Sequence, residues 1–193
     1  MASQPRPNEA ARLEVLHEFE VLDTDPEQTF DDITRLAAYI CHTPIAIITL
    51  VDAHRQWFKS RVGLSLSETA RDVSFCAHAI KQPGPMIVRD ALDDARFRDN
   101  PLVRADPYIR FYAGSPLVTI EGFSLGTLCV IDRYPREITP EQMAALRVLS
   151  QQVMTQLELR RTIKFLTRSV NEARQKVQEL EGRLQKEGGQ FAG

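Results

Sequence analysis

The sequence predicts an α+β fold in which helices pack on one face of a largely antiparallel sheet. Two amphipathic helical segments open the chain, five β-rich segments fill its middle, and one long helical segment closes it. Neighbouring strands that are joined by a short turn must run antiparallel. Such a turn, Glu121-Gly122, joins the last two β-rich segments, which therefore form a hairpin.

Two helices are expected before the first strand. Asn8 suits the N-cap of the first helix, in which Leu16 and Phe19 recur at helical spacing with other apolar residues. Pro26 then ends the helical pattern, because proline cannot continue a helix. A second helix is expected over residues 27–41. Its expected buried stripe consists of Phe30, Ile33, Leu36, Ala37 and Ile40.

The middle of the chain is rich in β-branched and aromatic residues, which favour strands. Trp57 and Phe58 are adjacent in one of these strands, so their side chains should point to opposite faces of the sheet. The polar stretch 63–72 is expected to be a loop, and Ser74 is a plausible cap for a short helix over 73–82. Strands are expected over residues 45–52, 56–62, 85–91, 109–120 and 123–132.

One long helix should close the chain, with Thr139 as its cap and Pro140 in its first turn. Its second part carries the a/d heptad of a coiled coil, beginning with Ile163 at position a. The heptad positions are Ile163, Leu166, Val170, Ala173, Val177, Leu180 and Leu184. Burying each such side chain contributes roughly 1.5 kcal/mol before entropy costs. We therefore expect a parallel homodimer through this helix; the alternative is a solitary, partly frayed helix.

Composition excludes several functional classes. The chain of 193 residues has 24 Lys and Arg against 26 Asp and Glu, and 24 − 26 = −2, so a dedicated nucleic-acid partner is not expected. No apolar run approaches the roughly 18–20 residues that span a bilayer, and the N-terminus lacks a signal-peptide core. Cys41, Cys76 and Cys129 form no CxxC or metal-ligand pattern. We expect reduced thiols, a cytoplasmic location, no membrane partner and no metal, and the sequence assigns no cofactor.

Residues 8–160 resemble a bacterial GAF domain of the kind found at the front of sensor kinases and diguanylate cyclases. The matching stretches are LDTDPEQTFDDITRLAA, ITLVDAHRQWFKS, VSFCAHAI, DDARFRDNPLV, IRFYAGSPL and LGTLCVIDRYPRE. The resemblance implies a six-stranded antiparallel sheet with helices behind it and a small-molecule pocket in front. The NKFDE-type motif of the cyclic-nucleotide-binding branch is absent from the sequence. Cys76 and His78 are separated by Ala77, unlike the phytochrome signature.

The expected organisation follows from these patterns. We expect a tail over residues 1–8, a GAF-like sensor domain over 9–158, a coiled-coil helix over 159–187 and a second tail over 188–193. The expected function is sensing of a small molecule or a redox change, transmitted through a dimeric coiled coil. The expected receiver is a histidine kinase or another signalling output, and no enzymatic activity is expected of the chain itself.

A ligand pocket is predicted between the sheet and the segment Val73–Asn100. A guanidinium and a phenol on neighbouring positions of one strand face would suit an anionic or planar ligand. The predicted ligand-binding residues are Phe75, Cys76, His78, Arg110, Tyr112 and Thr127.

Each of these residues also has a purely structural interpretation. Cys76 could be a small core residue, and His78 could hydrogen-bond a backbone carbonyl. Arg110 could be a surface residue that pairs with Asp106 or Asp99, with Tyr112 serving only in packing.

Two other functions remain open at this stage. One is a small thiol-based reductase that uses Cys76 or Cys129, similar to the free methionine sulfoxide reductases, which share the GAF fold. Its mark would be a thiol with a lowered pKa and a resolving partner within reach. The other is a structural dimerisation domain whose cavity is filled by side chains.

Overall fold

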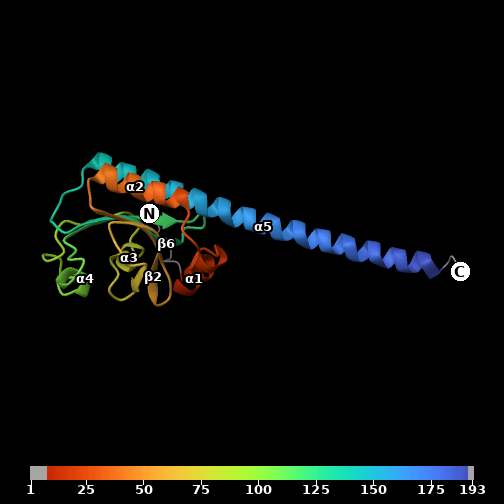
Figure 1. Ribbon diagram of the computed structural model, residues 1–193. Helices are drawn as coiled ribbons and strands as arrows, with labels where there is room; N and C mark the ends of the chain where they lie inside the picture. Colours follow the sequence, from red (N-terminus) through yellow and green to blue (C-terminus); the bar gives the residue numbers. More distant parts are fainter. Residues whose placement is uncertain (1–7, 191–193) are drawn as a thin grey trace, which may run out of the picture. The chain divides into compact units, whose positions relative to one another are not determined.

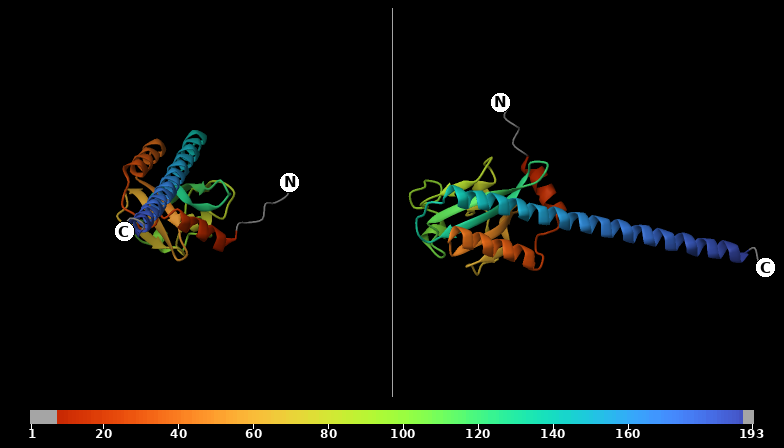
Figure 2. Two further views of the ribbon diagram at one scale, coloured as in Figure 1. Left: turned by 90° about the vertical axis from the view of Figure 1, so that its right-hand side faces the viewer. Right: turned by 90° about the horizontal axis from the view of Figure 1, so that it is seen from above.

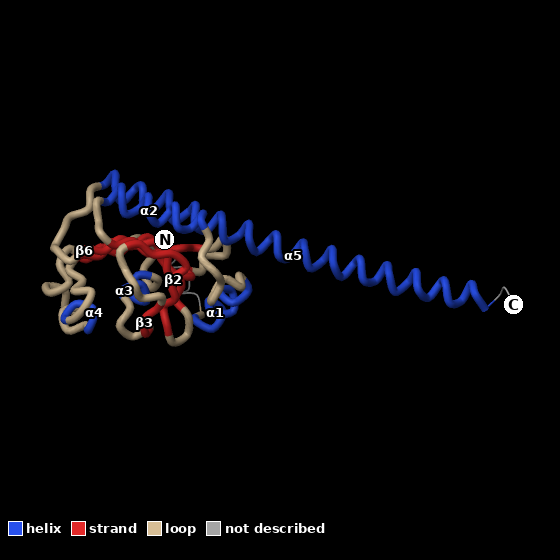
Figure 3. Tube along the Cα trace, viewed as in Figure 1, coloured by secondary structure: helices blue, strands red, loops and turns tan. Residues whose placement is uncertain are grey.

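A computed structural model describes the backbone of residues 8–190 and the side chains of residues 8–182. The strands are β1 (Ile45–Val51), β2 (Arg55–Val62), β3 (Glu68–Ala70), β4 (Met86–Val88), β5 (Phe111–Val118) and β6 (Ser124–Asp132). They form one sheet in the order β3-β2-β1-β6-β5-β4, and each neighbouring pair is antiparallel. Figures 1 and 3 show this sheet beneath α2 (Gln28–Cys41) and the first part of the long helix that follows it. The predicted α+β class is confirmed, as is the six-stranded sheet that the GAF resemblance implies.

Two helices precede the sheet, as predicted. The first, α1 (Glu9–Glu18), begins after Asn8, whose side chain accepts a hydrogen bond from the Ala10 amide at 3.1 Å. The second, α2 (Gln28–Cys41), buries Phe30, Ala37 and Cys41. Leu36 was expected in the buried stripe, but 45% of its surface is exposed. Thr34 is buried on that face instead, since its hydroxyl bonds to the Phe30 carbonyl at 2.9 Å.

The strands differ from their predicted ranges mainly at the edges of the sheet. Residues 85–91 were expected as a strand, of which only Met86–Val88 pairs with β5. The stretch 63–72 was expected as a loop, yet its residues Glu68–Ala70 pair with β2 as β3. A strand of three residues is too short for alternation to reveal, so pairing with β2 is what defines it.

Each face of the sheet buries its own core. The first core contains α2, the first part of α5 (Pro140–Gln190) and Trp57. Figures 1 and 2 show α2 and the beginning of α5 side by side over this face. The second core contains Phe58 and lies under α3 (Phe75–Ala79) and the surrounding loops. The opposite orientations predicted for Trp57 and Phe58 are therefore confirmed.

Helix α5 begins as predicted. The Thr139 hydroxyl accepts a hydrogen bond from the Gln142 amide at 3.2 Å, and the Gln142 side chain accepts one from the Thr139 amide at 3.1 Å. This reciprocal arrangement caps the first turn. Met143, Leu146 and Leu157 are buried in the first core.

The chain divides into two compact units, the first ending at Leu157 and the second beginning at Glu158. The second unit is helical through Gln190, which extends into the stretch 188–193 that we expected to be a tail. Residues 1–7 and 191–193 of the two expected tails lie outside the described residues. Over the part of the chain that the structure describes, no helix combines the length and the apolar character needed to cross a bilayer.

Candidate functional site

A group of polar and sulfur-containing side chains lies in the second core, beneath α3. Ser74 caps this helix, because its hydroxyl accepts a hydrogen bond from the Ala77 amide at 3.0 Å. The same hydroxyl donates to the buried Gln56 side chain on β2. Asn100 adds a second anchor by donating to the Val73 carbonyl at 2.8 Å. The short helix is therefore fixed to the sheet and to the loop that precedes α4 (Pro101–Arg104).

The two central strands and β5 provide the floor of the site. Thr49 of β1 lies opposite Thr127 of β6, and Gly114 of β5 lies opposite Cys129. A Cβ atom at Gly114 would come within 2.2 Å of the Tyr112 hydroxyl oxygen. The absence of a side chain at Gly114 therefore lets the Tyr112 ring lie across the strand and reach the middle of the sheet.

Two thiols meet at this point. Cys76 Sγ on α3 lies 3.9 Å from Cys129 Sγ on β6. The Tyr112 hydroxyl donates to Cys76 Sγ at 3.4 Å and lies 3.5 Å from the Thr127 hydroxyl. The Thr49 hydroxyl is buried beside them and has no hydrogen-bond partner within ordinary distance among the described residues. We call Cys76, Cys129, Tyr112, Thr127 and Thr49 the thiol cluster.

The surroundings of the two thiols make them chemically unequal. Burial raises the pKa of the Cys76 thiol, but neighbouring polar side chains outweigh this effect and lower its pKa to about 7. In order of effect these are Cys129, Thr127 and Tyr112, and last the Thr49 hydroxyl, which lies beyond ordinary hydrogen-bond distance. The pKa of Cys129 is raised well above its usual value, first because it bonds to Cys76 and then because it is buried. The pKa of the Cys76 thiol is therefore shifted in the opposite direction from that of Cys129, and Cys76 is the more readily ionised of the two.

Aromatic rings close the thiol cluster on its outer side. The Phe75 ring stacks on Phe97 with centroids 4.0 Å apart and on Tyr112 with centroids 5.4 Å apart. All three rings are buried, so side chains occupy this part of the predicted cavity. A ligand that bound here would have to displace them.

Four of the six predicted site residues meet in this region, namely Phe75, Cys76, Tyr112 and Thr127. His78 is only partly buried and contacts the edge of the Phe97 ring, with centroids 5.0 Å apart. Burial first, and then the nearby Lys81 and Arg96, lower the pKa of His78. His78 therefore lies at the margin of the cluster, which agrees with the prediction that residues two apart on a helix do not share a face.

Arg110 lies away from the thiol cluster. It immediately precedes β5, which begins at Phe111, and its amide donates to the Asp132 carbonyl at 2.9 Å. Its guanidinium forms a two-bond pair with Asp90, with Nε donating at 2.7 Å and Nη2 at 2.5 Å. The hydrogen bond from Arg110 holds the pKa of Asp90 below its usual range. Arg110 thus pairs as the structural interpretation expected, but with Asp90 rather than with Asp106 or Asp99.

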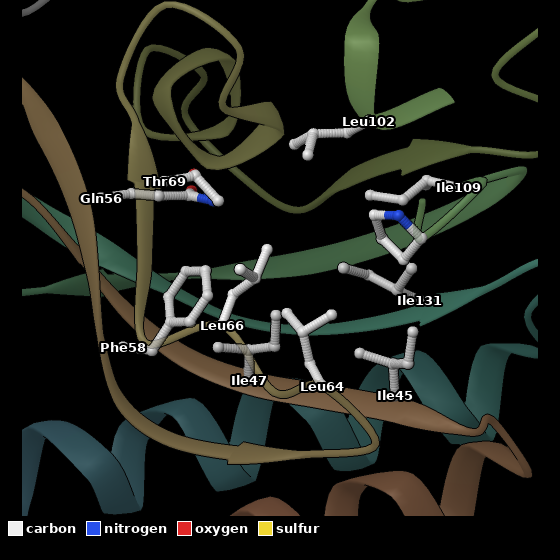
Figure 4. Close-up of a pocket in the computed structure, with 11 residues that line it drawn as sticks. Ile45, Ile47, Gln56, Phe58, Leu64, Leu66, Thr69, Leu102, Ile109 and Ile131 are labelled. Carbon is white, nitrogen blue, oxygen red and sulfur yellow. The ribbon is translucent and has the colours of Figure 1, made fainter. Parts of the chain in front are cut away.

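A small pocket lies on the same face of the sheet (Figure 4). Its interior is about 20 Å³, room for one water-sized group, since a buried water needs roughly 10–15 Å³. The pocket is lined by Ile45, Ile47, Gln56, Phe58, Leu64, Leu66, Thr69, Leu102, Pro107, Ile109 and Ile131, which include none of the six predicted residues.

The pocket and the thiol cluster share structural elements. Ile131 follows Cys129 by two residues on β6, and Ile47 is the β1 partner of Cys129. Gln56 lines the pocket and accepts the hydrogen bond from Ser74. Strand β6 and the cap of α3 therefore connect the thiol cluster with the pocket.

Sequence reasoning placed Cys129 inside an apolar strand but did not place it among the ligand-binding residues. Its partner in the cluster is 53 positions away in sequence, and no local spacing indicates such a contact. Among the described residues, no group of three or more His, Cys, Asp or Glu side chains is arranged to hold a metal ion. The chemistry that the cluster offers is therefore that of two thiols and a phenol.

Comparison with curated proteins gives a relative from Pseudomonas aeruginosa that is named a cyclic di-GMP phosphodiesterase. It is 41% identical over 168 residues, which make up 86% of this chain and 29% of the relative. Our expectation of a protein without enzymatic activity is wrong in light of this relative, whose name is that of an enzyme. This chain of 193 residues spans less than a third of the relative's length, and most of the relative lies outside the match.

Two solved structures illustrate the similarity in fold. A domain of a putative two-component sensor histidine kinase from Sinorhizobium meliloti has a TM-score of 0.58 and 20% identity, covering 74% of this chain and 97% of that one. A free methionine-R-sulfoxide reductase from Neisseria meningitidis, solved with its substrate, has a TM-score of 0.58 and 15% identity, covering 84% and 98%. At such low identity these structures support the fold alone.

The family itself is identified by a separate comparison. The model of the GAF domain matches residues 25–157, which span β1 to β6, α2 and the buried part of α5. This match covers more than half of the chain and agrees with the observed sheet order. The chain belongs to the GAF domain family.

Proposed function

We propose that this chain is the sensory part of a bacterial cyclic di-GMP signalling protein, and that its state sets the rate at which cyclic di-GMP is hydrolysed. The observation that carries the proposal is the 41% identity to a protein named a cyclic di-GMP phosphodiesterase. The match covers only 29% of that relative, so the hydrolytic step is assigned to an output that the GAF domain controls. We further propose a cytoplasmic location, where a cyclic dinucleotide messenger acts.

A chimera tests this assignment directly. The matching segment of the Pseudomonas relative is replaced by the corresponding segment of this chain, and hydrolysis of cyclic di-GMP is measured against the parent and against a version lacking the segment. The expected result is a rate closer to the parent than to the truncated version. A chimera that folds but behaves like the truncated version would contradict the proposal.

The sensory site is proposed on the face of the sheet beneath α3. Its candidate ligand contacts remain Phe75, Cys76, His78, Arg110, Tyr112 and Thr127, with the small pocket beside them as a point of entry. The present volume of about 20 Å³ admits no metabolite, so ligand binding requires α3 or the loop carrying Leu64 and Leu66 to move outward. Mass spectrometry of small molecules that co-purify with the protein, followed by calorimetric titration, tests whether a ligand is recognised.

Arg110 and Tyr112 distinguish two modes of ligand recognition. If an anionic ligand displaces Asp90 from the Arg110 guanidinium, Arg110→Ala should weaken ligand binding by roughly 1.5–3 kcal/mol, as expected for a charged hydrogen bond. Arg89 is an exposed arginine next to Asp90 in the sequence and pairs with Glu137 at 3.4 Å, and Arg89→Ala is the matched control. Equal affinities for the Arg110→Ala variant and the parent protein would remove Arg110 from the site.

Transmission is proposed to run through a homodimer of the helix after Glu158. Ile163, Leu166, Val170, Val177 and Leu180 are each 50–56% exposed in the single chain. The described a positions are Ile and Val, and Leu occupies two of the d positions. This pattern favours a coiled coil of two parallel helices. The final predicted heptad residue, Leu184, lies outside the residues whose side chains are described.

Substitution on and off the proposed seam tests the dimer. Leu166→Asp buries a charge in a coiled-coil interface and should produce a monomer in light scattering, because an unpaired buried charge is costly. Phe165 is also exposed, at 68%, but lies one position off the seam. Phe165→Asp should remain dimeric, and a monomeric parent protein would refute this part of the proposal.

A small thiol-based reductase is the second candidate, and one observation favours it. Cys76 has a lowered pKa and a second thiol at 3.9 Å, the combination that such an enzyme requires. A reductase must also admit its substrate to the reactive sulfur, and both thiols are buried beneath α3 and the aromatic rings. The same burial must be overcome by a sensed ligand, so the sensory assignment is preferred on another ground, the 41% identity to the Pseudomonas relative.

A further inference from the structure

The thiol cluster has no counterpart in the first core of the sheet. Cys41, the third cysteine, is the last residue of α2 and is buried in the apolar core, and burial raises its pKa to about 11. Cys76 and Cys129 are equally buried, yet they contact each other and are surrounded by hydroxyl groups. Packing alone does not require two thiols and a phenol to meet at the centre of a sheet.

We propose that Cys76 and Cys129 form a reversible intramolecular disulfide when a small hydroperoxide reaches the second core, and that this makes the GAF domain a thiol switch. The inference concerns only these side chains. It requires neither a bound small molecule nor the cyclic di-GMP output, so it can succeed or fail independently of the proposed function.

The distance between the two sulfur atoms suits this step. They must approach from 3.9 Å to about 2 Å, the length of a disulfide bond. One sulfur belongs to a five-residue helix and the other to a central strand, so the short helix can supply the movement while the strand remains in the sheet. The pair closes a long loop of 53 positions, and such a cross-link constrains the chain strongly.

The reaction balances with a hydroperoxide as the only oxidant. The Cys76 thiolate attacks the outer peroxide oxygen, the O–O bond breaks, and one molecule of alcohol or water leaves with Cys76 as the sulfenic acid. The Cys129 sulfur then attacks the Cys76 sulfur, the S–O bond breaks and water leaves. In total, two thiols lose two electrons and two protons, and hydrogen peroxide becomes two molecules of water.

The two roles follow from the geometry of the cluster. Cys76 has the Tyr112 hydroxyl donating to its sulfur at 3.4 Å, which stabilises the thiolate that attacks the peroxide. Cys129 lies on the other side at 3.9 Å, where it can resolve the sulfenic acid. Once the disulfide forms, the sulfur of Cys76 is no longer ionisable and becomes a poorer acceptor for Tyr112. The switch therefore changes the hydrogen bonding of a ring that spans β5 and packs on Phe75.

Alkylation followed by mass mapping tests the proposal on the full chain. The reduced protein is treated with hydrogen peroxide in its native state, quenched in acid, unfolded and alkylated. Without peroxide, all three cysteines should be alkylated. After peroxide, only Cys41 should be alkylated, and the peptides carrying Cys76 and Cys129 should be linked with the loss of two hydrogen atoms. Treatment with dithiothreitol should restore all three alkylation sites.

Three variants test which cysteine attacks the peroxide and which resolves the sulfenic acid. The unsubstituted protein is measured as well, so that the test does not depend on a variant that fails to fold. Cys41→Ser should behave like the parent. Cys129→Ser should accumulate a sulfenic acid at Cys76 that dimedone traps, whereas Cys76→Ser should form no intramolecular link. The proposal is overturned if the folded parent keeps all three thiols at peroxide levels that oxidise the urea-unfolded chain. It is also overturned if the only link formed involves Cys41 or joins two chains.

Discussion

Cys41 and Cys76 are both buried thiols, but they lie on opposite faces of the same sheet. Cys41 is packed among apolar side chains of the first core, and burial raises its pKa to about 11. Cys76 is buried just as deeply, yet donors from Cys129, Thr127, Tyr112 and Thr49 lower its pKa to about 7. Burial therefore does not decide the chemistry of a cysteine; the polar groups that are buried with it do.

The two cores also differ in the elements that cover them. The first core contains Leu16, Phe30, Leu146 and their neighbours, and it joins three helices to the sheet. The second core is covered by a five-residue helix and loops, and it contains the two thiols that contact each other. We infer that the first core supplies most of the stability and the second supplies the chemistry.

The largest expected effect is in the first core. Leu146 is fully buried between α5 and the sheet, so Leu146→Ala should lower the free energy of unfolding by about 2–5 kcal/mol. Val148, two residues later on the same helix, is 56% exposed, and Val148→Ala should change stability by less than about 0.5 kcal/mol. Urea denaturation followed by circular dichroism measures both. Similar losses in the free energy of unfolding for the two variants would contradict the conclusion that the buried face of α5 stabilises the first core.

A smaller effect is expected from overpacking the second core. A Cβ atom at residue 114 would come within 2.2 Å of the Tyr112 hydroxyl oxygen, so Gly114→Ala should force that ring to move and cost roughly 1–3 kcal/mol. Gly84 has open space around the same atom, and Gly84→Ala is the matched control. Denaturation curves that coincide for both variants would show that the Tyr112 ring can be displaced freely.

Removal of the Tyr112 hydroxyl tests why the pKa values of Cys76 and Cys41 differ. Tyr112→Phe keeps the ring but deletes the donor to Cys76, so it should cost about 1 kcal/mol. It should also raise the pKa of Cys76, because a thiolate loses one of its donors. The pH dependence of thiolate ultraviolet absorbance measures this shift. Burial alone shifts the pKa of Cys41 among the described residues, so its titration should not change.

The smallest effect concerns a carboxylate outside both cores. Hydrogen bonds from Arg12, and to a smaller extent a hydrogen bond from Arg71, lower the pKa of Glu9 to about 2. Because the folded-state pKa is lowered, the stabilisation is present above the ordinary pKa of 4.5 and is lost as the pH falls toward about 2. Thermal denaturation between these pH values should therefore show a steeper decline for the parent than for Glu9→Gln. Parallel curves would contradict the assignment.

Much of the fold could be predicted because it depends on local patterns. The N-cap at Asn8, the opposite orientations of Trp57 and Phe58, and the cap at Thr139 each follow from a few neighbouring residues. Strand β3 could not be predicted, since three residues carry no period and only pairing with β2 defines them.

The site was harder to predict because it depends on distant contacts. The guanidinium of Arg110 is paired with Asp90, a contact between residues 20 positions apart in the sequence. The meeting of Cys76 and Cys129 follows from the central place of β6 in the sheet and from the anchoring of α3 through Ser74 and Gln56. Neither feature is visible in the spacing of residues along the chain.

The alternation along β6 has a mechanical consequence. Thr127, Cys129 and Ile131 face the second core, while Leu128 and Val130, which lie between them, face the first. The backbone of β6 is therefore the single layer that separates the two cores at these residues. Any displacement of residue 129 is carried by the same peptide units to residues 128 and 130. A movement of Cys129 in the second core would therefore also move Leu128 and Val130 in the first core.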